Sequence, residues 1–122
     1  MKRCLIVDDS RVIRRVASRI VEDLGFEAEE VADGAKALAL SQKRIPDIVL
    51  LDWEMPGLTG IEYVKELRKL PGGDAAKVIF CATENDVEQI KLALDSGADE
   101  YIMKPFDSDI VRAKFHIVGA ID

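Results

Sequence analysis

The sequence predicts an α/β domain: a doubly wound, five-stranded parallel sheet of order 2-1-3-4-5 with five helices. Short apolar runs alternate five times with segments whose apolar residues follow helical spacing. One run, residues 48–51 (IVLL), has no polar position at all. Such a strand is typical of the middle of a parallel sheet, where helices cover both faces. Because crossovers between parallel strands are right-handed, five such units favour helices on both sides of one sheet.

The strands are predicted from short apolar runs bounded by turn residues. Residues 27–31 (EAEEV) are less apolar than the others, which favours an edge position for this strand. Pro71 to Asp74 (PGGD) is the clearest loop and separates the third helix from the fourth strand. The expected strands are residues 3–7, 27–31, 48–51, 77–81 and 100–103.

Each helix is expected to begin at a residue whose side chain can accept a hydrogen bond from backbone N–H groups of the first turn. Thr59 followed by Glu62 has the pattern of a capping box. Gly25 and Gly97 follow the last apolar positions of the first and fourth helices, where glycine commonly ends a helix. The helices are expected to begin near Ser10, Asp33, Thr59, Asn85 or Asp86, and Ser108.

The helical spacing also predicts which side chains are buried. In the first helix these are Ile13, Val16, Ala17, Ile20 and Leu24; in the fourth, Val87, Ile90 and Leu94; in the fifth, Ile110, Val111, Phe115 and Val118. The opposite face of the first helix carries Arg11, Arg14, Arg15 and Arg19. We expect this arginine face to be solvated, with docking of an acidic partner as the alternative.

Length and charge limit the classes of function. We expect residues 1–122 to form a single domain without an output domain, since this length buries a sufficient core. The net charge of -6 argues against direct nucleic-acid binding, which requires clustered cations. The sequence contains no apolar stretch of 18 residues, so no membrane-spanning helix is predicted, and the apolar run near the N-terminus is too short for a signal peptide. Cys4 and Cys81 lie in apolar runs, which predicts buried free thiols in a cytoplasmic protein.

Polar residues that could carry out chemistry follow three of the expected strands. Asp8 and Asp9 follow the first, Asp52 the third and Lys104 the fifth. Each alone is ordinary turn chemistry, but the carboxyl ends of neighbouring parallel strands converge at the switch point of the sheet. Crowded carboxylates repel one another, and a hard divalent cation such as Mg²⁺ or Mn²⁺ would remove that conflict. Asp52 could then attack phosphorus as a nucleophile, while the cation and Lys104 offset the charge on the transferred oxygens.

Four motifs carry a resemblance to a known family. They are residues 5–10 (LIVDDS), 32–34 (ADG), 47–60 (DIVLLDWEMPGLTG) and 101–106 (YIMKPF). Over essentially its whole length the chain resembles the receiver domain of two-component response regulators, most closely the single-domain, CheY-like type with its flavodoxin-like fold. The resemblance implies that Asp52 accepts a phosphoryl group from a histidine kinase or histidine phosphotransferase. Such a domain is not a conventional enzyme, but it catalyses its own phosphorylation and dephosphorylation.

The resemblance also implies roles for other residues. Asp8, Asp9, Asp52 and the backbone carbonyl of Glu54 would hold Mg²⁺ or Mn²⁺. Lys104 would contact the phosphoryl oxygens, and the bond between Lys104 and Pro105 would be cis. A downstream protein would bind the face formed by the fourth helix, the fifth strand and the fifth helix.

One position departs from the family pattern. The family has a Ser or Thr hydroxyl at the end of the fourth strand, and counting without gaps places Ala82 there and Thr83 one residue later. Alanine cannot donate a hydrogen bond. Either a bulge lets Thr83 contact the phosphoryl group, or the coupling to the aromatic residue Tyr101 is absent. The second interpretation is favoured, because a one-residue shift would turn over both faces of the strand.

The sequence is therefore compatible with more than one function. The first is a phosphorelay switch that signals through protein contacts; the alternative is a phosphate-independent adaptor, or a phosphate sink whose Thr–Tyr switch is impaired by Ala82. An aspartyl-phosphate phosphatase of the haloacid-dehalogenase type would need an aspartate where Glu54 stands. A flavodoxin-like FMN-binding function is disfavoured, because Asp8 and Asp9 would repel the phosphate of FMN. His116, the only histidine, is interpreted as a surface or packing residue rather than a phosphate relay.

Overall fold

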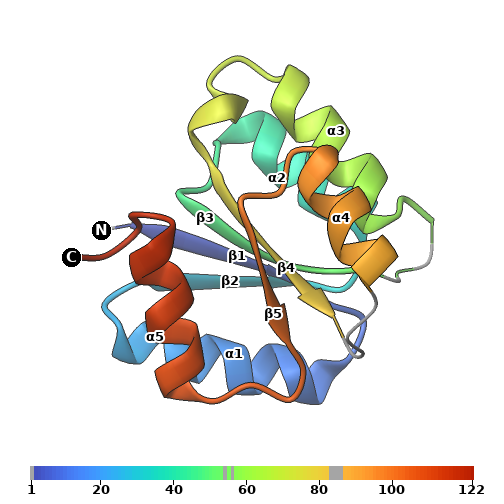
Figure 1. Cartoon of the computed structure of the whole chain (residues 1–122). Coiled ribbons are helices and arrows are strands. Elements are labelled where there is room, and N and C mark those ends of the chain that lie inside the picture. Colours follow the sequence, from blue (N-terminus) through green and yellow to red (C-terminus); the bar gives the residue numbers. More distant parts are fainter. Residues whose placement is uncertain (1, 54, 56, 83–86) are drawn as a thin grey trace.

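The predicted architecture is confirmed in a computed structural model, which describes residues 2–53, 55, 57–82 and 87–122 (Figure 1). Five parallel strands form one sheet of order β2-β1-β3-β4-β5. The strands are β1 (Arg3–Val7), β2 (Glu27–Val31), β3 (Ile48–Asp52), β4 (Lys77–Ala82) and β5 (Glu100–Met103). The helices are α1 (Arg11–Asp23), α2 (Gly34–Lys43), α3 (Gly60–Lys69), α4 (Val87–Asp95) and α5 (Ser108–Ile117), with a short 3₁₀ helix η1 (Gly73–Ala75).

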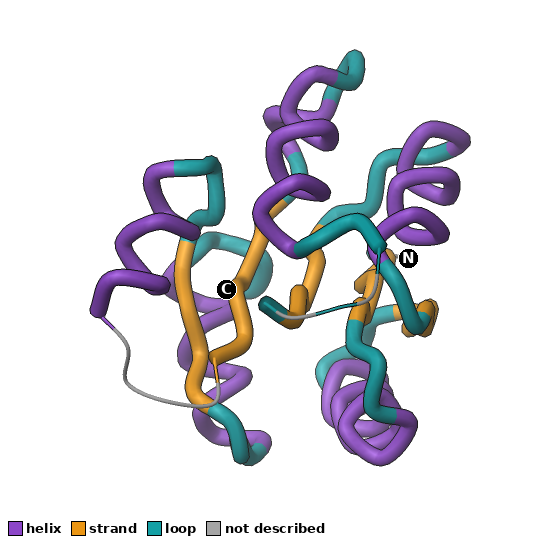
Figure 2. The backbone as a smooth tube through the Cα atoms, turned by 90° about the vertical axis from the view of Figure 1, so that its right-hand side faces the viewer, coloured by secondary structure: helices purple, strands orange, loops and turns teal. Residues whose placement is uncertain are grey.

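Helices cover both faces of the sheet, as Figure 2 shows. Alternate strand residues enter two separate hydrophobic clusters, because successive side chains of a strand point to opposite faces. One cluster joins the sheet to α2, α3 and α4, and the other joins it to α1 and α5. All five residues of β3 are buried, which agrees with its central position, and the polar strand β2 lies at an edge as expected.

The capping residues match the sequence pattern where the structure describes them. Ser10 and Asp33 accept hydrogen bonds from the backbone N–H groups of the first turns of α1 and α2. Thr59 and Glu62 form both hydrogen bonds of the capping box at α3. Helix α5 is capped by Asp107, one residue before the expected start. The expected caps of α4, Asn85 and Asp86, lie outside the described residues.

Some side chains that the helical spacing assigned to the core are exposed, and for them the prediction was wrong. They are Val16, Val87, Leu94 and Ile110, with exposed fractions of 46%, 70%, 38% and 41%. Conversely, Val21 of α1 is fully buried. The periodic pattern locates the apolar side of a helix, but how much of that side is covered depends on where the neighbouring elements lie.

Both cysteines are buried and free, as predicted. Burial raises the pKa of the Cys81 thiol to about 12, so it stays protonated at neutral pH. Among the described residues, no helix is long and apolar enough to cross a membrane.

Candidate functional site

Four charged side chains meet at the carboxyl ends of β1, β3 and β5. Asp8 and Asp9 follow β1, Asp52 is the last residue of β3, and Lys104 follows β5. Each of the three carboxylates offers an oxygen, and these atoms lie within 4.8 Å of one another. Lys104 Nζ donates to Asp8 Oδ2 at 2.6 Å and to Asp52 Oδ1 at 2.9 Å. The lysine therefore bridges two carboxylates that come from different strands.

Backbone contacts fix this arrangement. Asp8 N donates to Val31 O at 3.2 Å, and Asp8 Oδ1 accepts from Ser10 N at 2.8 Å. On the other side of the site, Lys104 N donates to Ala82 O at 2.6 Å, so the end of β4 holds the start of the loop after β5. Backbone hydrogen bonds to neighbouring strands thus hold both Asp8 and Lys104 in place.

Glycine at the start of α3 lets this helix approach Asp52 closely. A Cβ atom at Gly60 would lie 2.6 Å from the carbonyl oxygen of Asp52, a distance that real Cβ atoms do not show. Gly60 N in turn donates to Trp53 O at 3.4 Å. Any larger residue at position 60 would push α3 away from the end of β3.

The donor set suits a hard divalent cation. All the candidate ligand atoms are carboxylate oxygens, which Mg²⁺ and Mn²⁺ prefer. Asp8 and Asp52 are buried, with exposed fractions of 3% and 8%, whereas Asp9 is exposed. A cation could therefore enter from the Asp9 side and keep waters on its open positions, as Mg²⁺ usually does.

The charges of these groups depend on one another. Burial raises the pKa of Asp52, the hydrogen bond and charge of Lys104 lower it, and the charges of Asp8 and Asp9 raise it again, so the net pKa lies above its ordinary value. Burial by itself lowers the pKa of Lys104, but Asp8 and Asp52 outweigh that effect and raise it. Lys104 therefore stays charged, and ionised Asp52 is held at a net cost to the fold.

Replacing Asp52 with asparagine should consequently stabilise the metal-free domain at neutral pH. A carboxyl whose folded pKa is raised binds its proton more tightly in the folded state, so its contribution to stability falls as pH rises through that pKa. The gain in free energy of unfolding for Asp52→Asn should be largest near pH 7 and shrink towards pH 4. Urea unfolding in EDTA at several pH values measures it, with the exposed Asp74→Asn as control. A loss of stability at pH 7 would contradict the cost assigned to Asp52.

Ala82 occupies the last position of β4. It is 2% exposed and pairs with Met103 of β5, one step after the pair of Asp52 with Cys81. Within the described part of β4 the pairing with β3 and β5 runs in unbroken register. Thr83, the alternative hydroxyl, and Glu54, the expected carbonyl ligand, lie outside the described residues.

Tyr101 and Pro105 are two further residues that the resemblance singled out. Tyr101 is half-buried in β5, and Lys114 Nζ of α5 lies 4.5 Å from the centre of its ring. Lys114 also pairs with Glu100 at 3.4 Å. The peptide bond between Lys104 and Pro105 is cis.

The arginine face of α1 is not uniformly solvated, and for Arg14 that expectation was wrong. Arg11, Arg15 and Arg19 are exposed, but the Arg14 side chain is only 16% exposed and donates from Nη1 to Asp8 O at 2.7 Å. Sequence reasoning missed this contact, because the acceptor is a main-chain carbonyl that every residue type carries. A sequence signal that could have found it is helical spacing, because Arg14 lies three residues before Ala17 and seven before Val21, both of which are buried in α1.

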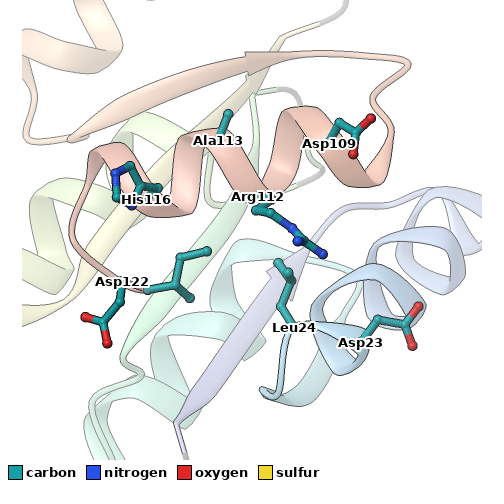
Figure 3. A pocket seen from close by; sticks show the side chains of 8 residues that line it. Asp23, Leu24, Asp109, Arg112, Ala113, His116 and Asp122 are labelled. Carbon is teal, nitrogen blue, oxygen red and sulfur yellow. The ribbon is translucent and has the colours of Figure 1, made fainter.

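A separate hollow of about 550 Å³ lies between the end of α1 and helix α5 (Figure 3). Its walls combine carboxylates with apolar groups and contain none of the site residues above. His116 lines it from α5 and is exposed, which agrees with its interpretation as a surface residue. The lining residues are Asp23, Leu24, Asp109, Arg112, Ala113, His116, Ile121 and Asp122.

Comparison with known proteins agrees with this geometry. Residues 4–116 match the family model of the response regulator receiver domain. The DNA-binding response regulator MtrA of Mycobacterium tuberculosis is 35% identical over 105 residues, which are 86% of this chain and 45% of MtrA. The chain thus spans less than half the length of the MtrA proteins. The chemotaxis protein CheY-3 of Vibrio cholerae is 36% identical over 113 residues, covering 92% of this chain and 87% of CheY-3.

Solved structures give the same result. The chemotaxis response regulator CheY4 of Vibrio cholerae superposes with a TM-score of 0.90 at 34% identity, covering 97% of this chain and 98% of CheY4. A CheY-like receiver domain protein from Methanospirillum hungatei superposes with a TM-score of 0.85 at 30% identity, covering 97% and 93%. The chain belongs to the response regulator receiver domains of two-component signalling and is CheY-like in sequence and fold.

Proposed function

We propose that this domain is a phosphorylation switch, in which Asp52 accepts a phosphoryl group from a histidine kinase or a histidine phosphotransferase in a Mg²⁺-dependent reaction. One observation carries the proposal: three carboxylates from two strand ends share one small site, and Lys104 bridges the two that are buried. Carboxylates repel one another, so their clustering next to a lysine supports a site that binds a cation and a phosphoryl group.

Asp52 supplies the nucleophilic oxygen. A bond forms between this oxygen and phosphorus while the bond between phosphorus and the histidine nitrogen of the donor breaks, which leaves an acyl phosphate on Asp52. Asp52 needs no general base, because at neutral pH a carboxylate carries no proton to remove. Lys104 is close enough to turn from Asp52 Oδ1 to a phosphoryl oxygen.

Asp8, Asp9 and Asp52 are the described residues that would hold Mg²⁺, and the carbonyl of Glu54 is proposed as a further ligand. When bound, the cation offsets the negative charge of the phosphoryl oxygens. Dephosphorylation would use the same groups to position a water. We place the domain in the cytoplasm, where its signal would leave through protein contacts on α4, β5 and α5.

A second candidate function is favoured by Ala82. Its methyl group cannot donate a hydrogen bond to a phosphoryl group, and the ring of Tyr101 is already held by Lys114 of α5. Phosphorylation at Asp52 could then leave Tyr101 unmoved, and the domain would act as an adaptor or as a phosphate sink. Equal affinity of a protein partner for the free and the beryllofluoride-treated domain would favour this function.

Mass spectrometry tests the phosphorylation itself. Incubation with acetyl phosphate and Mg²⁺ should add about 80 Da, the mass of one phosphoryl group, to the unmodified chain. Asp52→Asn should remove the whole gain, because the amide is a far weaker nucleophile than a carboxylate. Asp74→Asn, which changes an exposed carboxylate in the same way, should keep it. A gain that persists in Asp52→Asn, or in EDTA, would contradict the proposal.

A further inference from the structure

We propose that Arg14 is a positioning residue that holds the metal-binding segment Asp8–Asp9 in place. The inference rests on the proposed function, since it concerns how that site keeps its shape. Arg14 has no place among the metal-binding or phosphoryl-binding groups and touches the site only through the main chain of Asp8. Its role would be to set the affinity for the cation.

A chain of three contacts links α1 and β2 to the end of β1. Arg14 Nη1 donates to Asp8 O at 2.7 Å, and Arg14 Nε lies 3.5 Å from Glu30 Oε1 of β2. Ser18, buried one turn further along α1, donates from Oγ to Glu30 Oε2 at 2.8 Å. The side chains of Arg14 and Glu30 are only 16% and 29% exposed, so packing restricts the guanidinium to this position.

The contact bears directly on Asp9. The carbonyl of Asp8 and the N–H of Asp9 belong to one planar peptide unit, so a donor that fixes the carbonyl fixes the plane from which Asp9 extends. The other polar groups of Asp8 are already used, by Val31 O, Ser10 N and Lys104. The Asp9 side chain makes no hydrogen bond to a described residue, so no such bond orients it, and the peptide plane sets where its Cα–Cβ bond begins. Loss of Arg14 should therefore misdirect one ligand of the cation.

Charge alone predicts the opposite result, which makes the inference testable. Arg14 is a cation near a site for a cation, so its removal should strengthen Mg²⁺ binding if only electrostatics acted. If Arg14 positions the peptide of Asp8, its removal should weaken Mg²⁺ binding instead. The sign of the change separates the two explanations.

The experiment is a Mg²⁺ titration of the phosphate-free domain, followed by the fluorescence of Trp53, the only tryptophan and the neighbour of Asp52. Arg14→Gln should raise the dissociation constant about tenfold, the range found when a group that orients a metal ligand is lost. Arg15→Gln is the matched control, because it removes the same charge from an exposed position one residue away. It should leave the constant unchanged or lower it slightly.

The double variant Arg14→Gln/Glu30→Gln removes both partners of the ion pair and keeps the net charge. Because both charges are removed, no unpaired charge is left partly buried, so the double variant should fold even if Arg14→Gln does not. Its dissociation constant should still rise about tenfold. A wild-type constant in the double variant, or tighter binding by folded Arg14→Gln, would overturn the role of Arg14. Absence of a Mg²⁺ response in the wild type, or a response that survives Asp9→Asn unchanged, would instead overturn the proposed metal site.

Discussion

Replacing Lys104 with methionine is expected to lower the free energy of unfolding of the metal-free domain by about 3 to 5 kcal/mol at neutral pH, the cost of breaking a buried ion pair from one side. The side chains of Lys104, Asp8 and Asp52 are 10%, 4% and 11% exposed, so little water screens the two carboxylates once the ammonium is gone. Methionine is an unbranched side chain one atom shorter than lysine, so it keeps most of the apolar stem and removes the ammonium group with its hydrogen bonds.

The loss should depend on pH in a defined direction. Among the described residues Lys104 is the group that lowers the pKa of Asp52, so in its absence burial together with Asp8 and Asp9 should raise that pKa further. A carboxyl with a raised folded pKa binds its proton more tightly in the folded state, so stability is recovered as pH falls through that pKa. The deficit of Lys104→Met should therefore be largest near pH 7 and shrink in acid. Mg²⁺ should stabilise this variant more than the wild type, because no lysine opposes the ion.

Phosphorylation should suffer even where Mg²⁺ restores the fold. Loss of one preorganised group that stabilises transition-state charge typically costs about 100-fold in rate. The rate of acetyl phosphate uptake at saturating Mg²⁺ measures this effect, and urea unfolding in EDTA measures stability. Lys65→Met, which makes the same change at an exposed position of α3, should alter neither. Equal urea midpoints for Lys104→Met and the wild type would refute the structural role of this lysine.

The fold and the centre of the site could be predicted because their signals are local. A run of four apolar residues indicates a central strand, and Asp52 follows directly from its end. The pair Thr59 and Glu62 indicates a helix start through hydrogen bonds that span only three residues. Once the order of parallel strands is assumed, the meeting of Asp8 with Lys104 follows from the topology.

What could not be predicted is which polar side chains turn back onto the main chain. The sequence pattern assigned Arg14 to the solvated face of α1, and it singled out no role for Arg68 of α3. Their acceptors are carbonyl oxygens, and a carbonyl has no signature in the sequence because every residue has one. Only the packed structure shows that both arginine side chains are largely buried, with exposed fractions of 16% and 17%.

Arg68 gives rise to the second large effect that we expect: Arg68→Met should lower the free energy of unfolding by about 3 to 4 kcal/mol. Arg68 Nη1 donates to Gly73 O and Ala76 O, both at 2.7 Å, while Nε and Nη2 donate to Gly97 O at 3.1 and 2.7 Å. Nη2 also contacts Asp99 Oδ2 at 3.0 Å. One side chain of α3 thus holds the turn before β4 and the turn before β5.

The size of the effect comes from the carbonyls that would lose their donors. Each hydrogen bond from a charged donor contributes roughly 1.5 to 3 kcal/mol to the free energy of unfolding. When one side chain makes several such bonds, their joint contribution is smaller than the sum of the separate contributions. Asp99 would lose a cation as well, although its Oδ2 would still accept from Val78 N at 2.7 Å. Because a domain of this size has about 5 to 15 kcal/mol of stability, the variant should fold but unfold at clearly lower urea.

Two further variants separate hydrogen bonding from charge. Arg68→Lys keeps the charge, but a single ammonium group cannot reach three carbonyls on different segments, so it should recover less than half of the loss. Lys69→Met removes a neighbouring cation whose side chain is 71% exposed, and it should change stability by less than about 0.5 kcal/mol. The Arg68 contacts lie where β4 and β5 begin, at the other end of the sheet from Asp52. Folded Arg68→Met should therefore bind Mg²⁺ with the wild-type dissociation constant, and an Arg68→Met variant as stable as Lys69→Met would show that these carbonyls find other donors.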